Sequence, residues 1–396
     1  MIPVDEMFRR LDEALAGVTL SSERVALSEA QDRILASDQV SRLDLPPFNK
    51  SSMDGYAVLE GDERDEYCVL GTVAAGHSRE LQLVAGSAVK VMTGAPVPAG
   101  TGRVIVQEST QERDGILTVH RHDREANICW QGEDLRRGDL VLQGGTVLGA
   151  LEIANLLACG ITEVDVVRRV RLAIISTGDE IVASPDQLAA GKIIDTNGPL
   201  LAGLARDFGL AVVKRASVPD DKDVTAAEIR SALEDADVVI CSGGISVGEF
   251  DFVHGALSDL GLRLRFAGVA SKPGRPMTCA TAGSKVVLAL PGNPVAVYLM
   301  FHLCVLRVVA LMSGRKPGLR ELTLRLGSDF KRRKAERQEY VPSRLERDGA
   351  VLPVEFHGSA HLAALMHCDG FIVVPVGCSE LRAGSTVTFV PVGRRV

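Results

Sequence analysis

The sequence predicts a multidomain α/β plus all-β protein, with a parallel α/β ligand-binding domain, a helical stalk domain that carries an inserted small β domain, and a C-terminal β-barrel. Three observations support this fold class. The chain has 396 residues, which is too long for one ordinary hydrophobic core. Apolar strands alternate with helices between residues 171 and 315, whereas short alternating runs separated by turn residues occupy 45–134 and the region after 320.

The first part of the chain predicts the stalk and the inserted domain. Residues 5–16 and 27–36 have the apolar spacing of amphipathic helices, and helical periodicity returns at 148–157. Between them lie short β-type runs at 88–92, 103–107 and 115–120. We therefore expect a helical stalk domain made of 1–40 and 136–168, with a β domain at 41–135 inserted into it.

The α/β domain is expected at 169–317. Strands are predicted at 172–176, 211–215, 238–241 and 286–290, with helices at 198–208 and 224–233, which together indicate an open parallel sheet. The most apolar segment, 294–312, is predicted to be a buried helix rather than a membrane span, because it contains His302 and Arg307. Asn293 suits its N-cap, Pro294 its first turn and Gly314 its end.

The remaining residues, 318–396, are predicted to form a β-barrel, with a sandwich as the alternative, from alternating runs at 322–326, 371–376 and 386–390.

The eight cysteines never form a CxxC pair and are interpreted as reduced, buried thiols. A net charge of -7 and a pI near 5.7 disfavour nucleic-acid and anionic-membrane partners. The first 20 residues lack a signal-peptide core, so we expect a cytoplasmic protein.

Two glycine-containing loops directly follow predicted strands, at 176–180 (STGDE) and 242–248 (SGGISVG). Ligands of open α/β sheets bind at the carboxyl ends of the strands. Gly243 and Gly244 would let backbone N–H groups approach a phosphate, and Ser242 adds a hydroxyl. One such loop is equally well explained as a tight turn, but two on one sheet favour a ligand site.

Acidic and basic side chains stand near these loops. Glu180, Asp221 and Asp251 are candidate magnesium ligands, with Asp220 as an alternative to Asp221, because carboxylates near a phosphate loop commonly hold this ion. Solvated loop charge is the simpler reading of any one of them. The segment 271–276 (SKPGRP) offers Lys272 and Arg275 for a small oxyanion.

The motifs at 52–58 (SMDGYAV), 92–98 (MTGAPVP), 132–134 (GED), 176–180, 242–248, 272–276 (KPGRP) and 290–294 (LPGNP) together resemble the molybdopterin molybdenumtransferase family, which includes the E domain of gephyrin. The resemblance runs in order over nearly the whole chain. It implies four domains per subunit and an elongated homodimer, in which the α/β domain of one subunit faces the inserted β domain of the other.

The resemblance also implies a magnesium-dependent transferase that inserts molybdate into adenylated molybdopterin and yields molybdenum cofactor and AMP. The alternative is a paralogue that carries or scaffolds the cofactor without inserting metal. A separate molybdopterin adenylyltransferase would act upstream, and molybdoenzyme apoproteins or chaperones are further candidate partners.

Matched position by position, the family pattern implies a set of site residues. The catalytic candidates are Asp54, Thr93, Glu180, Asp251 and Lys272; the substrate-binding candidates are Asp134, Thr177, Ser242, Gly243, Gly244, Arg275, Pro291, Pro294 and Ser359; the metal candidates are Glu180, Asp221 and Asp251.

Three positions depart from the family pattern. Gly268 and Ala296 stand where a lysine and a serine are common, and Pro342 stands where an arginine is usual. These changes remove polar partners from the molybdate side, and the sequence leaves open whether Arg344 compensates.

Overall fold

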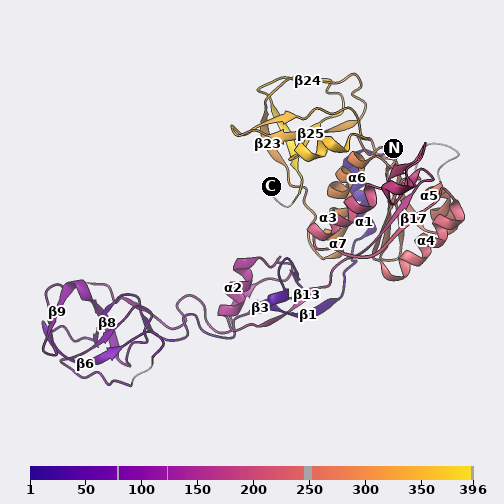
Figure 1. Cartoon of the computed structure of the whole chain (residues 1–396). Coiled ribbons are helices and arrows are strands. Elements are labelled where there is room, and N and C mark those ends of the chain that lie inside the picture. The colour runs from indigo at the N-terminus through magenta and orange to yellow at the C-terminus, as the bar shows by residue number, and fades with distance from the viewer. Residues whose placement is uncertain (78–79, 123, 245–251, 394–396) are drawn as a thin grey trace. The chain divides into compact units, whose positions relative to one another are not determined.

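The computed structural model describes residues 1–77, 80–122, 124–244 and 252–393 (Figure 1). The chain divides into two compact units. The first comprises Met1–Ser22 and Val167–Val396, and the second comprises Glu23–Val166. Each unit is described below by itself.

The first unit is built on a six-stranded sheet. Its strands lie in the order β17 (Ala211–Val218), β14 (Arg171–Thr177), β18 (Val238–Ser242), β22 (Lys285–Leu290), β21 (Thr278–Ala282) and β19 (Arg263–Ala267). β17, β14, β18 and β22, the four predicted strands, are parallel as predicted. Two strands that were not predicted extend the sheet: β21 pairs antiparallel with β22, and β19 pairs antiparallel with β21, so the sheet is not parallel at this edge. The turn between β21 and β22 is too short for the crossover that a parallel pair needs.

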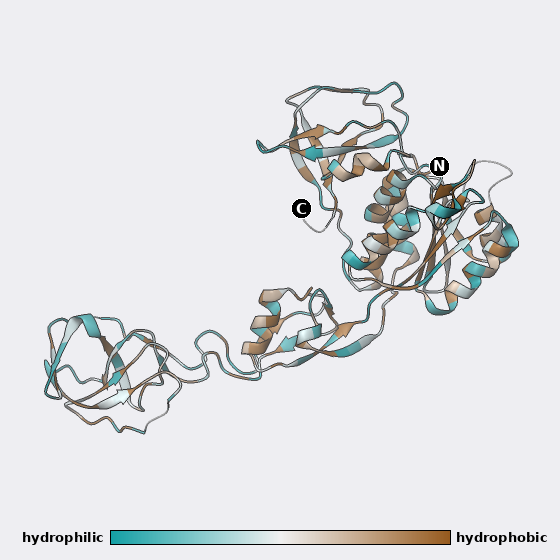
Figure 2. Cartoon of the chain, viewed as in Figure 1, coloured by the Kyte–Doolittle hydropathy of each residue, from teal (hydrophilic) through white to brown (hydrophobic). Residues whose placement is uncertain are grey.

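Helices cover both faces of this sheet because its strand residues alternate between two cores. Leu172 and Ile174 of β14 pack on one side with α1 (Val4–Ala14), α3 (Asn197–Asp207) and the long apolar helix. Ala173 and Ile175 pack on the other with α4 (Lys222–Asp235) and α5 (Phe252–Asp259). Figure 1 shows these two layers, and Figure 2 shows the hydrophobic colour of the strands between them. α1 thus contributes to this core, although residues 1–40 were assigned to the stalk.

The long apolar helix consists of α6 (Pro294–Met300), a π-helical turn (Phe301–Val305) and α7 (Leu306–Met312). It is long and apolar enough to cross a membrane, but 67% of it is buried inside the structure, which confirms the prediction of a core helix. Asn293 occupies the N-cap position as predicted, yet its side chain makes no capping hydrogen bond. It donates instead to Ser359 Oγ at 2.7 Å.

The C-terminal part of the first unit is a closed five-stranded barrel, so the barrel rather than the sandwich is correct. Its strands are β23 (Leu322–Leu326), β25 (Gln338–Leu345), β26 (Ala350–Pro353), β27 (Gly370–Val374) and β29 (Thr386–Pro391). Tyr340, Phe371 and Val390 point out of the barrel into the core around α6 and α7. The short strand β20 (Ser271–Lys272) pairs with β25 and joins barrel and α/β domain.

Short elements complete the first unit. They are β15 (Ile181–Val182) paired with β16 (Ile193–Ile194), β24 (Phe330–Lys331) paired with β28 (Glu380–Leu381), and two 3-10 helices at Pro185–Gln187 and Leu362–His367.

The second unit contains a six-stranded sheet in the order β8-β5-β7-β6-β10-β9, a three-stranded sheet, two strand pairs and one α-helix. The large sheet is made of β5 (Gly55–Leu59), β6 (Glu66–Val73), β7 (Ser87–Val91), β8 (Thr101–Val106), β9 (Thr110–Arg113) and β10 (Ile116–Val119), beside a 3-10 helix at Gln107–Ser109. The remaining elements are β1 (Ser22–Ala26), β13 (Glu163–Val167) and β2 (Ile34–Leu35); β4 (Lys50–Ser51) with β11 (Ile128–Cys129); β3 (Gln39–Val40) with β12 (Leu140–Leu142); and α2 (Ala150–Ala158).

The prediction of a helix at 27–36 is wrong. The structure has a 3-10 turn at Leu27–Glu29 and then strand β2. Leu27, Ala30 and Leu35 are buried as the apolar spacing suggested, but the backbone of Leu35 bonds to Thr146 rather than within a helix. Tertiary strand pairing therefore overrides the local periodicity, and the stalk is mostly strand.

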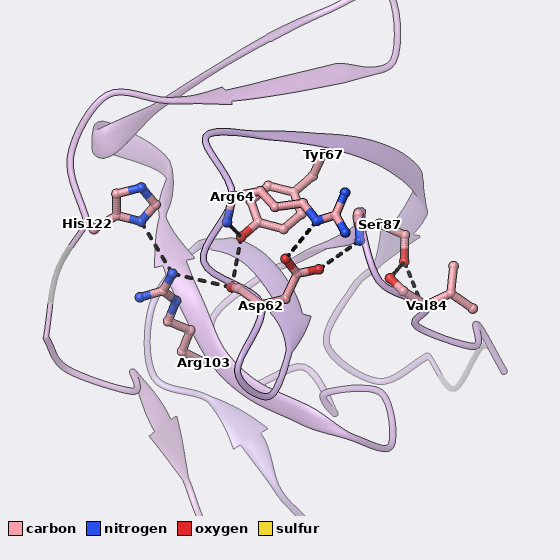
Figure 3. Close-up of polar contacts among 8 residues, drawn as sticks. Asp62, Arg64, Tyr67, Val84, Ser87, Arg103 and His122 are labelled. Carbon is pink, nitrogen blue, oxygen red and sulfur yellow. Dashed lines mark hydrogen bonds and ion pairs between the residues drawn. The ribbon is translucent and has the colours of Figure 1, made fainter.

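The polar network in Figure 3 is a structural feature of the inserted β sheet. The buried Tyr67 hydroxyl accepts the Arg64 N–H at 2.9 Å and donates to the Asp62 carbonyl at 2.9 Å. The Asp62 carboxylate accepts the Gly86 N–H at 2.7 Å and pairs with Arg64. These bonds fix the turn between β5 and β6, and we assign them no further role.

All eight cysteines are free, as predicted. The prediction that all of them are buried is wrong. Cys159, Cys241, Cys279 and Cys304 are buried, whereas Cys68 is exposed.

Candidate functional site

Three loops meet at the carboxyl edge of the α/β sheet, after β14, β18 and β22. Their approach is so close that a Cβ atom on Gly243 would lie 2.3 Å from the Thr177 carbonyl oxygen. Gly243 also has a φ of +97°, which side-chain-bearing residues rarely adopt. Only glycine satisfies both conditions, so Gly243 is required at this edge; residues 245–248 of the predicted loop lie outside the described residues.

Asn197 ties the loops together, and the sequence analysis missed it. Its Nδ2 donates to Ser242 Oγ at 2.9 Å and to the Gly292 carbonyl at 2.7 Å. Asn197 begins α3, a position that reads in sequence as an ordinary helix start. Its contacts become visible only once the strand ends are side by side.

A compartment of about 510 Å³, called here the sheet-side compartment, opens at this edge. Its lining includes Thr177, Glu180, Asn197, Ser242, Gly243 and Pro294. Among the described residues, Thr177 Oγ1 and Asn197 Oδ1 are buried there without a hydrogen-bond partner. Buried polar atoms normally find a partner, so both are suited to a ligand's polar groups.

The outer wall of the sheet-side compartment is apolar. Leu188, Ile193 and Ile194 line it from the segment around β15 and β16, and Leu188 and Ile193 are 50% and 57% exposed. Exposed apolar side chains beside orphaned polar atoms are typical of a pocket for a small ligand.

A larger cavity of about 920 Å³, called here the barrel-side cavity, lies between the α/β domain and the barrel. Its basic lining residues are Lys272, Arg275, Lys331, Arg332, Arg333, Lys334 and Arg337, against which stand only Glu336 and Glu339. This excess of positive charge on a protein of net charge -7 predicts an anionic ligand.

These cations fall into two groups, four with a partner and three without one among the described residues. In the first group, Lys331 pairs with Glu380, and Arg337 donates to the Ser271 carbonyl. Lys272 Nζ lies 2.6 Å from a Glu339 carboxylate oxygen, and Arg332 lies 3.3 Å from the other oxygen of the same carboxylate. Arg275, Arg333 and Lys334 have no side-chain hydrogen bond or ion pair within the part of the chain that the structure describes. The second group is therefore free to bind an anion.

The two spaces share a wall made of Gly292 and Asn293. Asn293 is held by Ser359, which also lines the barrel-side cavity. The predicted residues divide between the spaces: Thr177, Glu180, Ser242, Gly243 and Pro294 line the sheet-side compartment, and Lys272, Arg275, Pro291 and Ser359 line the barrel-side cavity. Gly244 follows Gly243, and a Cβ atom there would lie 2.6 Å from Thr177 Oγ1.

The predicted metal ligands do not form one cluster among the described residues. Asp221 uses one carboxylate oxygen to cap α4, accepting the Val224 N–H at 2.9 Å, while Asp220 faces the backbone of Asp179. Asp251 lies outside the described residues. Within the described ranges, no three Asp, Glu, His or Cys side chains are grouped to hold a metal.

The three departures from the family pattern have different consequences. Val341 lines the barrel-side cavity, and Pro342, the next residue of β25, points to the other strand face. Arg344 pairs with Glu346 and lines a different pocket, so it does not replace the missing arginine.

The other two departures lie elsewhere. Ala296 lines the barrel-side cavity, and Gly268 bonds through its backbone to Met277. The cations come instead from 331–337, a segment the sequence analysis did not single out.

The second unit holds Asp54, Thr93 and Asp134. One carboxylate oxygen of Asp54 accepts both the Thr93 backbone N–H at 2.7 Å and the Thr93 hydroxyl at 2.8 Å. These two bonds lower the pKa of Asp54. Asp134 is exposed and bonds through its backbone to Leu45. The unit thus presents an ionised carboxylate held by Thr93, a contact that the sequence did not predict.

Comparison with family models covers most of the chain. Residues 2–160 match the MoeA N-terminal region (domain I and II), 173–310 match a family described as probable molybdopterin binding domain, and 323–392 match the MoeA C-terminal region (domain IV).

Whole proteins and solved structures agree with these matches. The chain is 33% identical to a molybdopterin molybdenumtransferase of Staphylococcus epidermidis, over 98% of this chain and 94% of that protein. It is also 33% identical to one of Staphylococcus aureus, over 98% and 95%. The crystal structure of a molybdopterin biosynthesis moeA protein from Pyrococcus horikoshii OT3 superposes with a TM-score of 0.85 at 29% identity, covering 99% of this chain and all of that one.

Proposed function

The chain belongs to the molybdopterin molybdenumtransferase family, transferases of molybdenum cofactor biosynthesis, and from this premise we propose that it inserts molybdate into adenylated molybdopterin and releases AMP. The observation that carries this proposal is the shared wall at Gly292 and Asn293. It brings a compartment with unpartnered polar atoms next to a cavity rich in cations, as two substrates of different chemistry require.

In this proposal the sheet-side compartment holds the pterin part of the substrate. The backbone N–H of Gly244 would hold its phosphate, because glycine allows the closest backbone approach, whereas the Gly243 N–H already donates to the Leu290 carbonyl at 3.3 Å. Thr177 Oγ1 and Asn197 Oδ1 would bond to polar groups of the ligand, and Leu188 and Ile193 would contact its ring.

The barrel-side cavity would receive molybdate, which is a dianion. Lys272, Arg275 and Ser359 provide charge-assisted and hydroxyl donors there. Arg333 and Lys334, which have no described side-chain partner, would supply the positive charge that Pro342 cannot.

Magnesium is compatible with this arrangement. The ion usually takes only one or two protein carboxylates and completes its shell with substrate phosphates and water. The Glu180 carboxylate lines the sheet-side compartment, and with Asp251 and Asp221 as the other proposed ligands it would hold the ion near the phosphates. Bound there, magnesium would neutralise charge on the phosphoanhydride.

We further propose that the protein is a cytoplasmic homodimer of four-domain subunits. α2 presents an uncovered apolar face, with Leu151 and Leu157 being 82% and 53% exposed, and Figure 2 shows the hydrophobic colour over much of this helix. A second copy would cover such a face. Asp54, Thr93 and Asp134 would then serve the site of the other subunit, and a separate adenylyltransferase would supply the substrate.

The test is molybdate-dependent release of AMP from adenylated molybdopterin by the purified protein with magnesium. Asp251→Ala and Lys272→Ala are each expected to abolish release, and chelation of magnesium should do the same. Tight substrate binding without any release by the unaltered protein would reject the transferase and favour a carrier of the cofactor.

A further inference from the structure

Lys272 does not face the barrel-side cavity as a free cation, because it is paired with Glu339. We propose that Glu339 positions Lys272 and acts as an internal counter-anion, which the incoming oxyanion displaces. This inference rests on the proposed function and deepens it, since it names the residue that controls access of a dianion to the site.

The backbone brings the two residues together. β20 and β25 are parallel, and their register sets Lys272 opposite Glu339. Arg337 reinforces the junction by donating to the Ser271 carbonyl at 3.3 Å. The backbone pairing that attaches the barrel to the α/β domain therefore places Lys272 beside Glu339. The contact does not depend only on the rotamers of the two side chains.

Glu339 also has a second basic partner, Arg332. It is 7% exposed, and its second carboxylate oxygen lies 3.3 Å from Arg332. Arg332 in turn donates to the carbonyls of Cys378 at 2.7 Å and Arg337 at 2.8 Å, and its side chain is 4% exposed. A guanidinium with so many fixed acceptors cannot follow a ligand, so Glu339 keeps a permanent partner.

Lys272 is the mobile member of the group. Its side chain is 49% exposed, and a lysine ammonium on a flexible stem changes partners easily. When Lys272 turns to a ligand, Glu339 is still neutralised by Arg332, so no buried charge is left unpaired. A dianion attracts Lys272 about twice as strongly as a single carboxylate at the same distance, whereas a monoanion offers no such gain. The exchange therefore favours doubly charged oxyanions.

The decisive experiment compares Glu339→Gln with Glu336→Gln. Both residues line the barrel-side cavity, and both substitutions remove one negative charge, but only Glu339 contacts Lys272. Dissociation constants for molybdate alone, measured by equilibrium dialysis, are combined with kcat and KM for AMP release and with thermal unfolding as a check of folding.

For Glu339→Gln we expect molybdate to bind about threefold more tightly, because its competitor is gone, while kcat falls about tenfold because Lys272 is no longer positioned. Glu336→Gln removes the same charge from the cavity without touching Lys272, so any gain in molybdate affinity should come without the tenfold loss of kcat. Glu339→Asp, which keeps the charge, should restore weaker binding and part of kcat. In a Lys272→Met background, Glu339→Gln should no longer tighten molybdate binding threefold, because the ammonium for which the two anions compete is gone.

Equal behaviour of the two Gln variants would overturn the proposal, as would weaker molybdate binding by Glu339→Gln. If the unaltered protein released no AMP, the proposed function would fail, but the binding comparison would still decide the role of Glu339.

Discussion

The sheet-side compartment and the barrel-side cavity share a wall but are built in opposite ways. The first is made of backbone, glycine and short polar side chains at strand ends, with two buried oxygens unpartnered. The second is made of long cationic side chains, three of which have no partner within the described ranges. We therefore expect the first to be rigid and to select a ligand by shape and hydrogen bonds, and the second to be adaptable and to select by charge.

This difference has a practical consequence. A substitution in the sheet-side compartment meets neighbours that cannot move, so its effects should be large and tied to folding of the edge. A substitution in the barrel-side cavity meets solvated side chains, so its effects should be moderate, sensitive to salt and nearly neutral for stability.

The largest effect is expected for Gly243→Ala. The new Cβ atom would lie 2.3 Å from the Thr177 carbonyl at a φ of +97°, so the loop must move. We expect AMP release to fall by about 100-fold or more, since small displacements at a reacting site cost that much. Gly191→Ala is the matched control, because Gly191 has a φ of +81° but no atom within 4 Å of the added Cβ. Equal losses in both variants would show that backbone strain alone is responsible.

The long helix Pro294–Met312 supports both spaces, and its buried His302 makes it sensitive to acid. Burial lowers the pKa of His302 from the ordinary value of 6.5 to about 4, although the bond to the Tyr298 carbonyl opposes this shift. His302 Nε2 must accept the Gly393 N–H, which requires a neutral ring.

Between these two pKa values the unfolded state binds more protons than the folded state, so stability falls as pH falls from 6.5 to 4. We expect the free energy of unfolding to fall by about 3 kcal/mol over this window. Denaturant titration of the protein and of His302→Gln at several pH values measures the difference. An unchanged pH slope in the variant would contradict this assignment.

Thr177→Val tests the rigid compartment by hydrogen bonding alone. Valine has nearly the same shape, and Thr177 Oγ1 has no partner in the described structure. Stability without ligand should stay the same or rise by up to about 1 kcal/mol, whereas binding of adenylated molybdopterin should weaken at least tenfold. Thr177→Ser, which retains the hydroxyl, should bind nearly normally. If stability and binding fell together, Thr177 would serve packing instead.

The smallest effect is expected in the adaptable cavity, for the double variant Arg333→Ala and Lys334→Ala. The KM for molybdate should rise about fivefold at low salt and less at high salt, because exposed charges are screened. Thermal unfolding should hardly change, since both side chains are exposed. Lys316→Ala, an exposed cation outside both spaces, is the control. A KM that did not depend on salt would contradict a purely electrostatic role.

The sequence by itself determined the carboxyl edge at which the sheet-side compartment opens. Strand ends followed by glycine and hydroxyl residues identify a carboxyl edge, and the local rules that connect them to a ligand act over a few residues. Thr177, Ser242 and Gly243 were placed in this way, as were the core helix after Asn293 and most strands of the sheet.

The tertiary structure decided the rest. The 3-10 turn and strand at 27–36 and the contacts of Asn197 depend on partners far along the chain. So does the barrel-side cavity, whose cations at 331–337 meet Lys272 only because β20 pairs with β25. Local periodicity carries no information about such pairings, since they are selected by the free energy of the assembled core and charges rather than by neighbouring residues.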